Sequence, residues 1–397
     1  MIDWHILTGE YPPQTGGVGD YTALVARALA AEGDRVNVWA PPADGADVPT
    51  DPHVLVRRLP DHYGRRSLRA LDQALDAVPG PRRLLVQYVP HAFGLKGANL
   101  PFCVWLYSRR QDSVWIMFHE VAHPVSAGHR LTENLLGVVT RGMAALAGRA
   151  AERIFVSIPA WRSTVESIVG SRTSIEWLPV PSSIPDFQDV DGALAIRRRL
   201  AGDRPLVGHL GTYGHLIGSM LADWLSAFLA LTNCHILLLG RGAGAFRFRI
   251  AERFPQHADR LTAPGWLEAH VLSRHVGACD AMLQPYPDGA SSRRTSLMVG
   301  LAHAKPVVTT LGRLTEPLWS NCGAVLFGRT DDAASTAELT AALLADPTRL
   351  SALSSQARSL YAERFDLRHT IDRLRSRERL NNASLRLTAA VARSTGR

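Results

Sequence analysis

The chain has 397 residues and a net charge of +8 at pH 7, with 46% hydrophobic and 20% charged residues. This composition is typical of a folded globular protein, and the length predicts two domains rather than one. No apolar run is long enough for a membrane span, and the N-terminus lacks the basic and apolar regions of a signal peptide, so we expect a cytoplasmic protein.

The positive charge is concentrated near the C-terminus, where residues 365–397 carry 8 basic and 3 acidic side chains. A basic excess confined to one terminal segment does not form the broad basic face of a nucleic-acid-binding protein, so nucleic acid is not an expected partner. The cysteines are far apart and form no CxxC pair, which predicts neither a zinc site nor a disulfide framework. They are Cys103, Cys234, Cys279 and Cys322.

Strands and helices are expected to alternate through the first 180 residues, a pattern typical of a parallel sheet with helices on both faces. The expected strands are residues 2–7, 35–40, 54–59, 83–88, 113–118, 153–157 and 174–180. The expected helices are residues 20–31, 68–77, 131–146 and 160–169. The loop at 9–19 contains three glycines, at 16, 17 and 19, which permit close approach of the backbone to a ligand. Their spacing is not GxGxxG, and a flexible turn is the alternative interpretation.

Two polar loops follow strands of this first sheet, at the edge where such sheets bind ligands. The first is residues 87–94, QYVPHAFG, which combines aromatic surface with hydrogen-bonding groups. The second begins HEVAH at residues 119–123. This string matches HExxH formally, but it follows a strand directly instead of lying on a helix. A zinc protease is therefore disfavoured, whereas a site histidine or a structural histidine remains open for His119.

A Pro/Ser-rich segment at residues 178–185 predicts a linker between two domains. The alternation of strands and helices then restarts. The expected strands are residues 206–210, 234–239, 280–284, 306–310 and 324–326, and the expected helices begin near residues 193, 216, 333 and 367. Glycine-containing loops at 211–214 and 240–244 follow the first two of these strands.

Residues 286–310 make one strand-to-helix unit, in which a polar turn follows the strand at 280–284. Ser291 and Ser292 are candidates to cap the helix that runs to residue 304. Arg293 and Arg294 stand near the same helix start, where cations are unfavourable unless an anion binds them. The turn therefore predicts a phosphate site, and a solvated pair of arginines is the alternative.

The chain resembles a retaining glycosyltransferase of the GT-B type, in the large family 4 group. The matching strings are EYPPQTGGVGDYT at 10–22, FHE at 118–120, LPVPSSIP at 178–185, GHLGTYG at 208–214, LLLGRGAG at 237–244 and the stretch 286–310. The resemblance implies an α/β fold with two Rossmann-like, doubly wound domains facing each other across a cleft. It implies an N-terminal acceptor domain at 1–180, a C-terminal nucleotide-sugar domain at 186–364, and a basic helix and tail at 365–397, with the helix packing back toward the first domain.

The resemblance also implies roles for individual residues. His119 is the expected catalytic residue, beside the transferred sugar. The expected donor-binding residues are Gly16, Gly17, Gly211, Thr212, Gly240, Arg241, Asp288, Ser291, Ser292, Arg293, Arg294, Thr295 and Ser296. The expected acceptor-binding residues are Gln87, Tyr88, His91, Phe93 and Glu120. No metal site and no cofactor are expected, and a UDP-sugar is favoured over a GDP-sugar as donor.

The sequence departs from this family at two places. The usual pair of glutamates is replaced by Ser291 and Val299, and the usual basic pair after the first strand of the C-terminal domain is absent, with His215 the nearest basic group. Arg293 and Arg294 are expected to supply the missing charge, and Asp288 the missing sugar contact. Two alternatives stay open: a nucleotide-sugar 2-epimerase of the same fold, and a binding protein that has lost transfer. The acceptor is a sugar, a lipid or a small molecule, with peripheral membrane contact left open.

Overall fold

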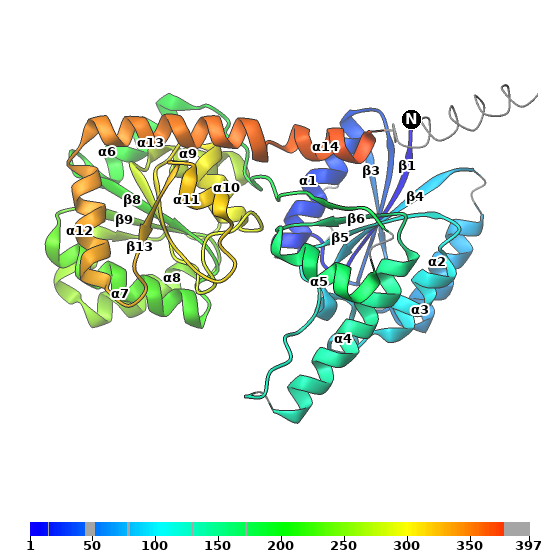
Figure 1. Ribbon diagram of the computed structural model, residues 1–397. Coiled ribbons are helices and arrows are strands. Elements are labelled where there is room, and N and C mark those ends of the chain that lie inside the picture. The colour runs from blue at the N-terminus through cyan, green and yellow to red at the C-terminus, as the bar shows by residue number, and fades with distance from the viewer. Residues whose placement is uncertain (15, 44–51, 78–79, 129, 171–172, 377–397) are drawn as a thin grey trace, which may run out of the picture.

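The computed structural model describes residues 1–376 apart from 15, 44–51, 78–79, 129 and 171–172. It contains two separate parallel sheets, each with helices on both faces (Figure 1). The predicted α/β class with two doubly wound sheets is therefore confirmed. The basic tail expected after the last helix falls at 377–397, outside the described residues.

The first sheet has seven parallel strands in the order β3-β2-β1-β4-β5-β6-β7. Its strands are β1 (Asp3–Thr8), β2 (Arg35–Ala40), β3 (Val54–Arg58), β4 (Arg82–Tyr88), β5 (Ser113–Phe118), β6 (Arg153–Val156) and β7 (Ile175–Trp177). Its helices are α1 (Gly17–Ala31), α2 (Arg65–Asp76), η1 (Pro90–Phe93), η2 (Leu95–Gly97), α3 (Leu100–Ser108), α4 (Leu131–Ala150) and α5 (Ala160–Val169). Most strand residues are buried from both sides, which explains their continuous apolar runs.

The helix α3 was not predicted, because its sequence LPFCVWLYS is apolar on nearly every side and shows no helical periodicity. A local signal was nevertheless present. Asn99 accepts a hydrogen bond at its side-chain oxygen from the backbone N–H of Phe102 (3.0 Å), and Pro101 lies in the first turn. This is an ordinary helix start.

The second sheet has six parallel strands in the order β10-β9-β8-β11-β12-β13. They are β8 (Leu206–Leu210), β9 (His235–Leu239), β10 (Leu261–Thr262), β11 (Ala281–Gln284), β12 (Val307–Thr310) and β13 (Val325–Gly328). The helices around it are α6 (Val190–Ala201), α7 (His215–Leu231), α8 (Ala243–Arg253), η3 (Pro255–Arg260), α9 (Ala269–Ala278), α10 (Thr295–Ala302), α11 (Pro317–Asn321), α12 (Ala333–Leu344) and α13 (Pro347–Leu360).

The strand order reverses once in each sheet. The chain moves outward from β1 to β3 and then returns to place β4 on the other side of β1, and likewise β11 returns beside β8. Loops at the carboxyl ends of strands diverge at such a reversal and leave a crevice for ligands. The two sheets therefore each provide one binding edge.

A run of helices, interrupted at Asp366, crosses from the second sheet to the first along one side of the molecule (Figure 1). It consists of α13, the short π-helical segment η4 (Tyr361–Phe365) and α14 (Leu367–Arg375). Ile371 and Leu374 of α14 are buried in the core beside α1, and Arg375 pairs with Asp34 (3.0 Å). The last helix is thus attached to the first sheet, although the preceding helix covers the second.

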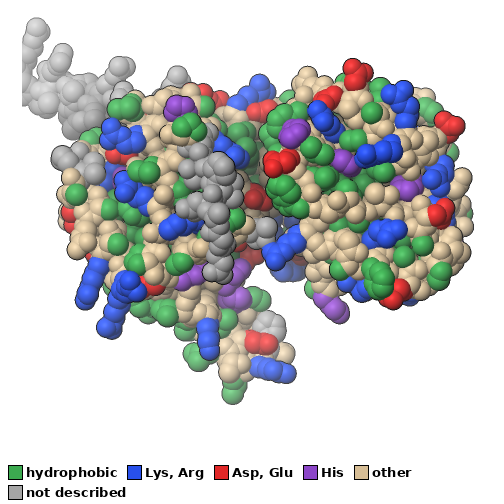
Figure 2. Space-filling view, turned by 180° about the vertical axis from the view of Figure 1, so that it is seen from behind, with side chains coloured by type: hydrophobic (Ala, Val, Ile, Leu, Met, Phe, Trp, Pro, Cys, Tyr) green, Lys and Arg blue, Asp and Glu red, His purple; other side chains and the backbone are tan. Residues whose placement is uncertain are grey.

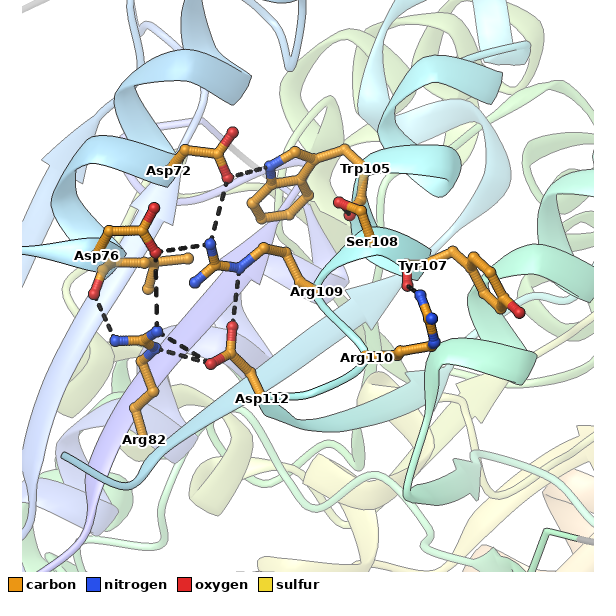
Figure 3. Close-up of polar contacts among 10 residues, drawn as sticks. Asp72, Asp76, Arg82, Trp105, Tyr107, Ser108, Arg109, Arg110 and Asp112 are labelled. Atoms are coloured by element: carbon orange, nitrogen blue, oxygen red, sulfur yellow. Dashed lines mark hydrogen bonds and ion pairs between the residues drawn. The ribbon is translucent and has the colours of Figure 1, made fainter. Parts of the chain in front are cut away.

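The opposite face of the first sheet is held by a network of charges at the amino end of its central strand, β4 (Figure 3). Arg109 follows α3 and pairs with Asp112 (2.8 Å) and Asp76 (2.8 Å). Arg82, at the start of β4, pairs with Asp112 as well (3.0 Å). These partly buried pairs fix the C-terminal end of α3 against α2 and the sheet.

No helix among the described residues is long and apolar enough to cross a membrane. The four cysteines carry no disulfide bond in the structure.

Acid should destabilise the protein, because several histidines are buried in neutral form. Burial lowers the pKa of His119 to about 3 and the pKa of His209 to about 4, from an ordinary value of 6.5. The same cause, burial, gives His5 and His235 a pKa of about 4. Between pH 6.5 and 4 the unfolded chain therefore binds protons that the folded chain does not, so stability falls as pH falls.

One buried group opposes this trend. Burial and the neighbouring Glu10 raise the pKa of Asp20 to about 6, so the folded state holds a proton there that the unfolded state releases above its ordinary pKa of 3.8. Each unmatched group changes stability by about 1.4 kcal/mol per pH unit, and the histidines outnumber Asp20. We expect the free energy of unfolding to fall by roughly 4–6 kcal/mol between pH 6.5 and 5. Urea unfolding followed by tryptophan fluorescence at several pH values measures this, and a flat profile would contradict it.

Candidate functional site

We call the part of the chain built around the first sheet the first unit, and the part built around the second sheet the second unit. A cavity of about 290 Å³ lies at the carboxyl ends of β1, β4 and β5, and the second unit closes it with Arg293 and Thr295. From the first unit it is lined by Gly9, Glu10, Gly17, Val18, His62, Val89, His91, Ala92, His119, Glu120 and Val180. Figure 2 shows the groove between the two units from the rear. The binding edges of the two sheets therefore meet at one place, which we call the central cavity.

The carboxylate of Glu10 binds the backbone of the glycine loop before α1. Its Oε1 accepts hydrogen bonds from the backbone N–H groups of Val18 (2.8 Å) and Gly19 (2.9 Å), so a carboxylate already satisfies the first turn of α1. A Cβ atom at Gly16 would lie 2.2 Å from Glu10 Oε2. A side chain at Gly16 would therefore meet Glu10, and Gly16 does not line the central cavity, so its predicted contact with the donor stays a prediction. Gly17 does line the central cavity, opposite Thr295.

Sequence reasoning missed Glu10, although a signal existed. A carboxylate one or two residues beyond a strand, ahead of a glycine-rich helix start, is well placed to bind the free N–H groups of that helix.

His119 is held firmly at the end of β5. Its backbone carbonyl accepts hydrogen bonds from Ser157 Oγ (3.2 Å) and Trp161 Nε1 (3.1 Å). Its Nε2 donates to the side-chain oxygen of Gln87 (2.8 Å), which leaves Nδ1 as an acceptor. Burial, aided by the charge of Arg293, keeps the pKa of the imidazole near 3. The site therefore contains a neutral histidine whose ring is held by Gln87.

The loop that follows β4 contributes less to the cavity than expected. Tyr88 is fully buried and packs on Phe118, with ring centres 4.9 Å apart. Phe93 is also fully buried and stacks on Phe102 at 4.3 Å. The prediction that Tyr88 and Phe93 bind the acceptor is thus wrong, because both rings form the core beneath the loop.

The other predicted acceptor residues divide into two groups. His91 and Glu120 line the central cavity, together with His62, which the sequence analysis did not select. Gln87 is fully buried, and its side-chain oxygen accepts from His119, so it orients the histidine instead of facing an acceptor.

Substitution of Tyr88 tests whether this side chain belongs to the core or to the site. Tyr88→Ala should lower the free energy of unfolding by about 3–5 kcal/mol, the usual cost of removing a buried aromatic ring. Tyr88→Phe should cost little, because the hydroxyl has no hydrogen-bond partner within the described part of the chain. The matched control His91→Ala, at an exposed side chain, should change stability by less than about 0.5 kcal/mol. Urea unfolding measures all three, and a stable Tyr88→Ala variant would contradict the assignment.

Two arginines on the turn before α10 meet carboxylates rather than solvent. Asp288 accepts hydrogen bonds from the guanidinium groups of both Arg293 and Arg294, and Arg293 Nη1 also pairs with Glu120 Oε1 across the groove (3.1 Å). Burial alone would raise the pKa of Asp288, but the charges of Arg294 and Arg293 lower it below its ordinary value. The Nε atoms of both arginines are buried and unpartnered within the described part of the chain. The charges of the two arginines are therefore matched by Asp288 and Glu120, and each guanidinium keeps one buried N–H without a partner among the described residues.

The serines of this turn do not cap α10, contrary to expectation. The residue before the helix is Arg294, with no side-chain cap. Ser292 Oγ donates to the backbone carbonyl of Ser157 (2.9 Å) and accepts from Trp177 Nε1 (3.1 Å), which joins the two units. Ser291 is completely buried. Neither serine is therefore free to contact a diphosphate as predicted.

Two further residues of the turn were predicted to bind the donor. Thr295 lines the central cavity. Ser296 Oγ lies 2.8 Å from Tyr286 Oη, so the two hydroxyls form a hydrogen bond within the turn.

The loops after β8 and β9 pack on each other. Gly240 has a φ of +95°, and a Cβ atom there would lie 2.4 Å from the carbonyl oxygen of Gly211. These two predicted donor residues are thus in mutual contact, which requires glycine at residue 240. Thr212 and Arg241 are exposed beside them.

A second cavity, of about 540 Å³, adjoins these loops. It is lined by Gly214, His215, Leu216, Ile217, Pro287, Asp288, Arg294 and Arg313. The first turn of α7 therefore opens on the same space as Arg294, and free helix N–H groups together with a cation favour an anion. We call this the α7 cavity. Of its basic residues, the sequence predicts only Arg294 as a donor ligand; Arg313 is not among the predicted residues.

Within the described residues, no three His, Cys, Asp or Glu side chains are placed to hold a metal ion. The HEVAH string follows β5 directly, and no helix resumes before Leu131. The arrangement therefore differs from the helix that carries HExxH in zinc proteases.

No protein-family model and no curated protein matches this chain. Solved structures do. Sucrose-phosphate synthase from Thermosynechococcus elongatus superposes with a TM-score of 0.70 at 18% identity, covering 98% of this chain and 100% of that one. Anabaena HepE in complex with UDP and glucose gives 0.66 at 15% identity, covering 94% and 98%. An α,α-trehalose-phosphate synthase from Burkholderia vietnamiensis gives 0.67 at 14%, covering 94% and 96%. The expected GT-B fold, with two Rossmann-like domains, is confirmed.

Proposed function

We propose that the protein is a glycosyltransferase that moves a sugar from a nucleotide-sugar donor to an acceptor hydroxyl. One observation carries the proposal: the central cavity brings a neutral His119 of the first unit to Arg293 of the second, and Asp288 links Arg293 to Arg294 at the α7 cavity. The first group suits a polar, uncharged sugar, and the second suits a diphosphate leaving group.

The α7 cavity supports the assignment of the donor. The phosphates would lie between the first turn of α7 and Arg294, and the nucleoside would extend over the loops at Thr212 and Arg241. A UDP-sugar is our preferred donor, because HepE, which shares this fold, has been solved with UDP and with UDP-glucose. The charge that holds the phosphates would come from the turn before α10, and not from the loop after β8.

Transfer is proposed to retain the configuration of the sugar, as in the glycosyltransferase group that the sequence resembles. The bond from the anomeric carbon to the diphosphate breaks, the bond to the acceptor oxygen forms on the same face, and the acceptor proton passes to the leaving phosphate. Arg293 and Arg294 stabilise the charge that develops on that phosphate. The carboxylates at the cavity have other partners: Glu10 binds α1, and Glu120 and Asp288 bind arginines. A mechanism with a protein nucleophile is therefore not needed.

The positions of the missing glutamates are closed to the donor. Ser291 and Val299 are both completely buried. Asp288 could contact the sugar only if a bound diphosphate took over its arginines, which we propose as its role.

A nucleotide screen tests the proposal. Thermal-shift measurements with UDP, GDP and their sugars should show stabilisation by one nucleoside diphosphate, which fixes the base. Incubation with the matching nucleotide sugar and candidate acceptors should then yield a glycoside of retained configuration. Exchange at C2 of the sugar would instead indicate the epimerase, and binding without turnover would indicate a binding protein.

A further inference from the structure

The first unit carries two stripes of exposed apolar side chains on neighbouring helices. On α4, Leu131, Leu135 and Val138 are 88%, 64% and 60% exposed. On α3, which packs against α4, Leu100 and Val104 are 40% and 53% exposed. In each stripe the spacing of three or four residues places the side chains on one helix face. We call these residues the α3–α4 face.

This face adjoins the acceptor side of the central cavity. Leu136 of α4 lies against Gly97 of η2, and Gly97 lies against His91, which lines the cavity. Leu95, in the same short segment, is 58% exposed. The start of α4 projects away from the body of the unit (Figure 1), and Figure 2 shows histidine side chains grouped at the base of this projection.

Basic side chains are exposed on or next to the same elements as the apolar ones. Lys96, Arg110, Arg130 and Arg141 are all exposed on or beside η2, α3 and α4. The one acidic residue in the first turn of α4 is Glu133, whose carboxylate accepts a hydrogen bond from the backbone N–H of Arg130 (2.9 Å). The face therefore combines aliphatic surface with an excess of positive charge.

The exposure does not come from loose packing. The opposite side of α3 is anchored to α2, because Trp105 Nε1 donates to Asp72 (2.7 Å) and Arg109 binds Asp76 and Asp112 (Figure 3). Below its stripe, α4 buries Met143 and Ala147 in the core of the first sheet. Both helices thus present their apolar stripes on a fixed support.

We propose that the α3–α4 face docks on the surface of an anionic lipid bilayer. Aliphatic side chains that stand out among lysine and arginine fit an interface in which the former enter the acyl boundary and the latter meet acidic headgroups. A projecting helix end reaches a flat surface more readily than it fills a groove on a protein partner. If the proposed function holds, the docked protein faces the membrane beside His91, so its acceptor is carried by a lipid.

Vesicle sedimentation tests the docking without nucleotide or acceptor, so its outcome is independent of glycosyl transfer. The full chain should bind phosphatidylglycerol–phosphatidylcholine vesicles and bind pure phosphatidylcholine vesicles far less. The triple variant Leu131→Ser, Leu135→Ser, Val138→Ser should bind at least roughly tenfold more weakly. Arg141→Glu should weaken binding at least about fivefold, and added salt should weaken it further. The control variant Leu194→Ser, Leu231→Ser, Phe248→Ser changes residues of the second unit that are 48%, 54% and 61% exposed, and it should bind like the parent.

The proposal is overturned if the parent does not bind anionic vesicles, or if the α4 triple variant binds them as tightly as the parent. Size-exclusion chromatography of both proteins covers the remaining case: a parent dimer that the triple variant converts to a monomer would make this face a contact between two copies of the chain. Transfer to a water-soluble acceptor should be unaffected by the triple variant. A parent that binds the vesicles but transfers sugar to no acceptor would instead count against the proposed function.

Discussion

Replacing His119 by alanine should reduce the rate of sugar transfer roughly 10²-fold or more, with nucleoside diphosphate binding almost unchanged. The imidazole lines the central cavity, whereas the α7 cavity, where we propose that the phosphates bind, does not include it. The side chain should therefore act on the transferred sugar and not on the nucleotide.

A second expectation follows from the low pKa of His119. Because burial and Arg293 lower its pKa to about 3, the imidazole is neutral at every pH at which the protein is stable. His119 should then act as a fixed hydrogen-bonding group and not as an acid. The pH profile of the parent should show no inflection near 6.5 that disappears in His119→Ala.

The control for this variant is His235→Ala, which removes a histidine that is equally buried but lies at the start of β9, away from both cavities. Both variants lose a buried imidazole, so thermal unfolding reports any general loss of stability. Donor affinity by calorimetry and transfer rates at saturating donor complete the comparison. If His119→Ala transfers sugar at the parent rate, His119 belongs to the structure alone.

The sheets were largely predictable from the sequence. Residues 113–118 and 35–40 form strands with the predicted bounds, and most other predicted strands differ by one or a few residues at their ends. These segments are buried on both faces, so their apolar runs are long and end abruptly at polar loops. Because these strands are apolar throughout, the sequence did not show in which direction each side chain points. A strand that is apolar throughout does not indicate which residues reach beyond its end, and Tyr88 therefore seemed as accessible as His91.

The details of the site depended on contacts that no local pattern shows. Glu120 pairs with Arg293, 173 residues away, and Ser292 binds the carbonyl of Ser157, 135 residues away. Such pairs exist only once the two sheets face each other. The sequence indicated that Arg293 and Arg294 needed an anion, and this was physically sound, but Asp288 supplies it within the same turn.

Arg293 and Arg294 line different cavities, and this makes the prediction for donor binding more specific. Arg293 lines the central cavity and is held by Glu120, whereas Arg294 lines the α7 cavity beside the first turn of α7. Arg294 should therefore contact the phosphates directly. A hydrogen bond to a charged group contributes about 1.5–3 kcal/mol. Arg294→Ala should thus weaken binding of the nucleoside diphosphate roughly 10- to 150-fold, while the free nucleoside binds almost as before.

Asp288 complicates this expectation in a testable way, because its carboxylate occupies both arginines in the absence of donor. A diphosphate must displace that carboxylate or share the guanidinium groups with it. Asp288→Asn keeps the shape of the side chain but removes the competing charge, so it should bind the diphosphate more tightly than the parent. If the same variant also transfers sugar more slowly, Asp288 contacts the donor sugar once the phosphates have replaced it at the arginines.

Calorimetry with nucleoside diphosphate and nucleoside decides between these outcomes. Arg329→Ala is the matched control, since it removes an exposed arginine of the second unit that pairs with Asp331 at the surface. It should leave both affinities unchanged. If Arg293→Ala and Arg294→Ala both bind the diphosphate like the parent, the two arginines serve only to pair with carboxylates at the start of the helix. The phosphates would then have to bind at the free N–H groups of α7, at residues 214–217, without help from these arginines.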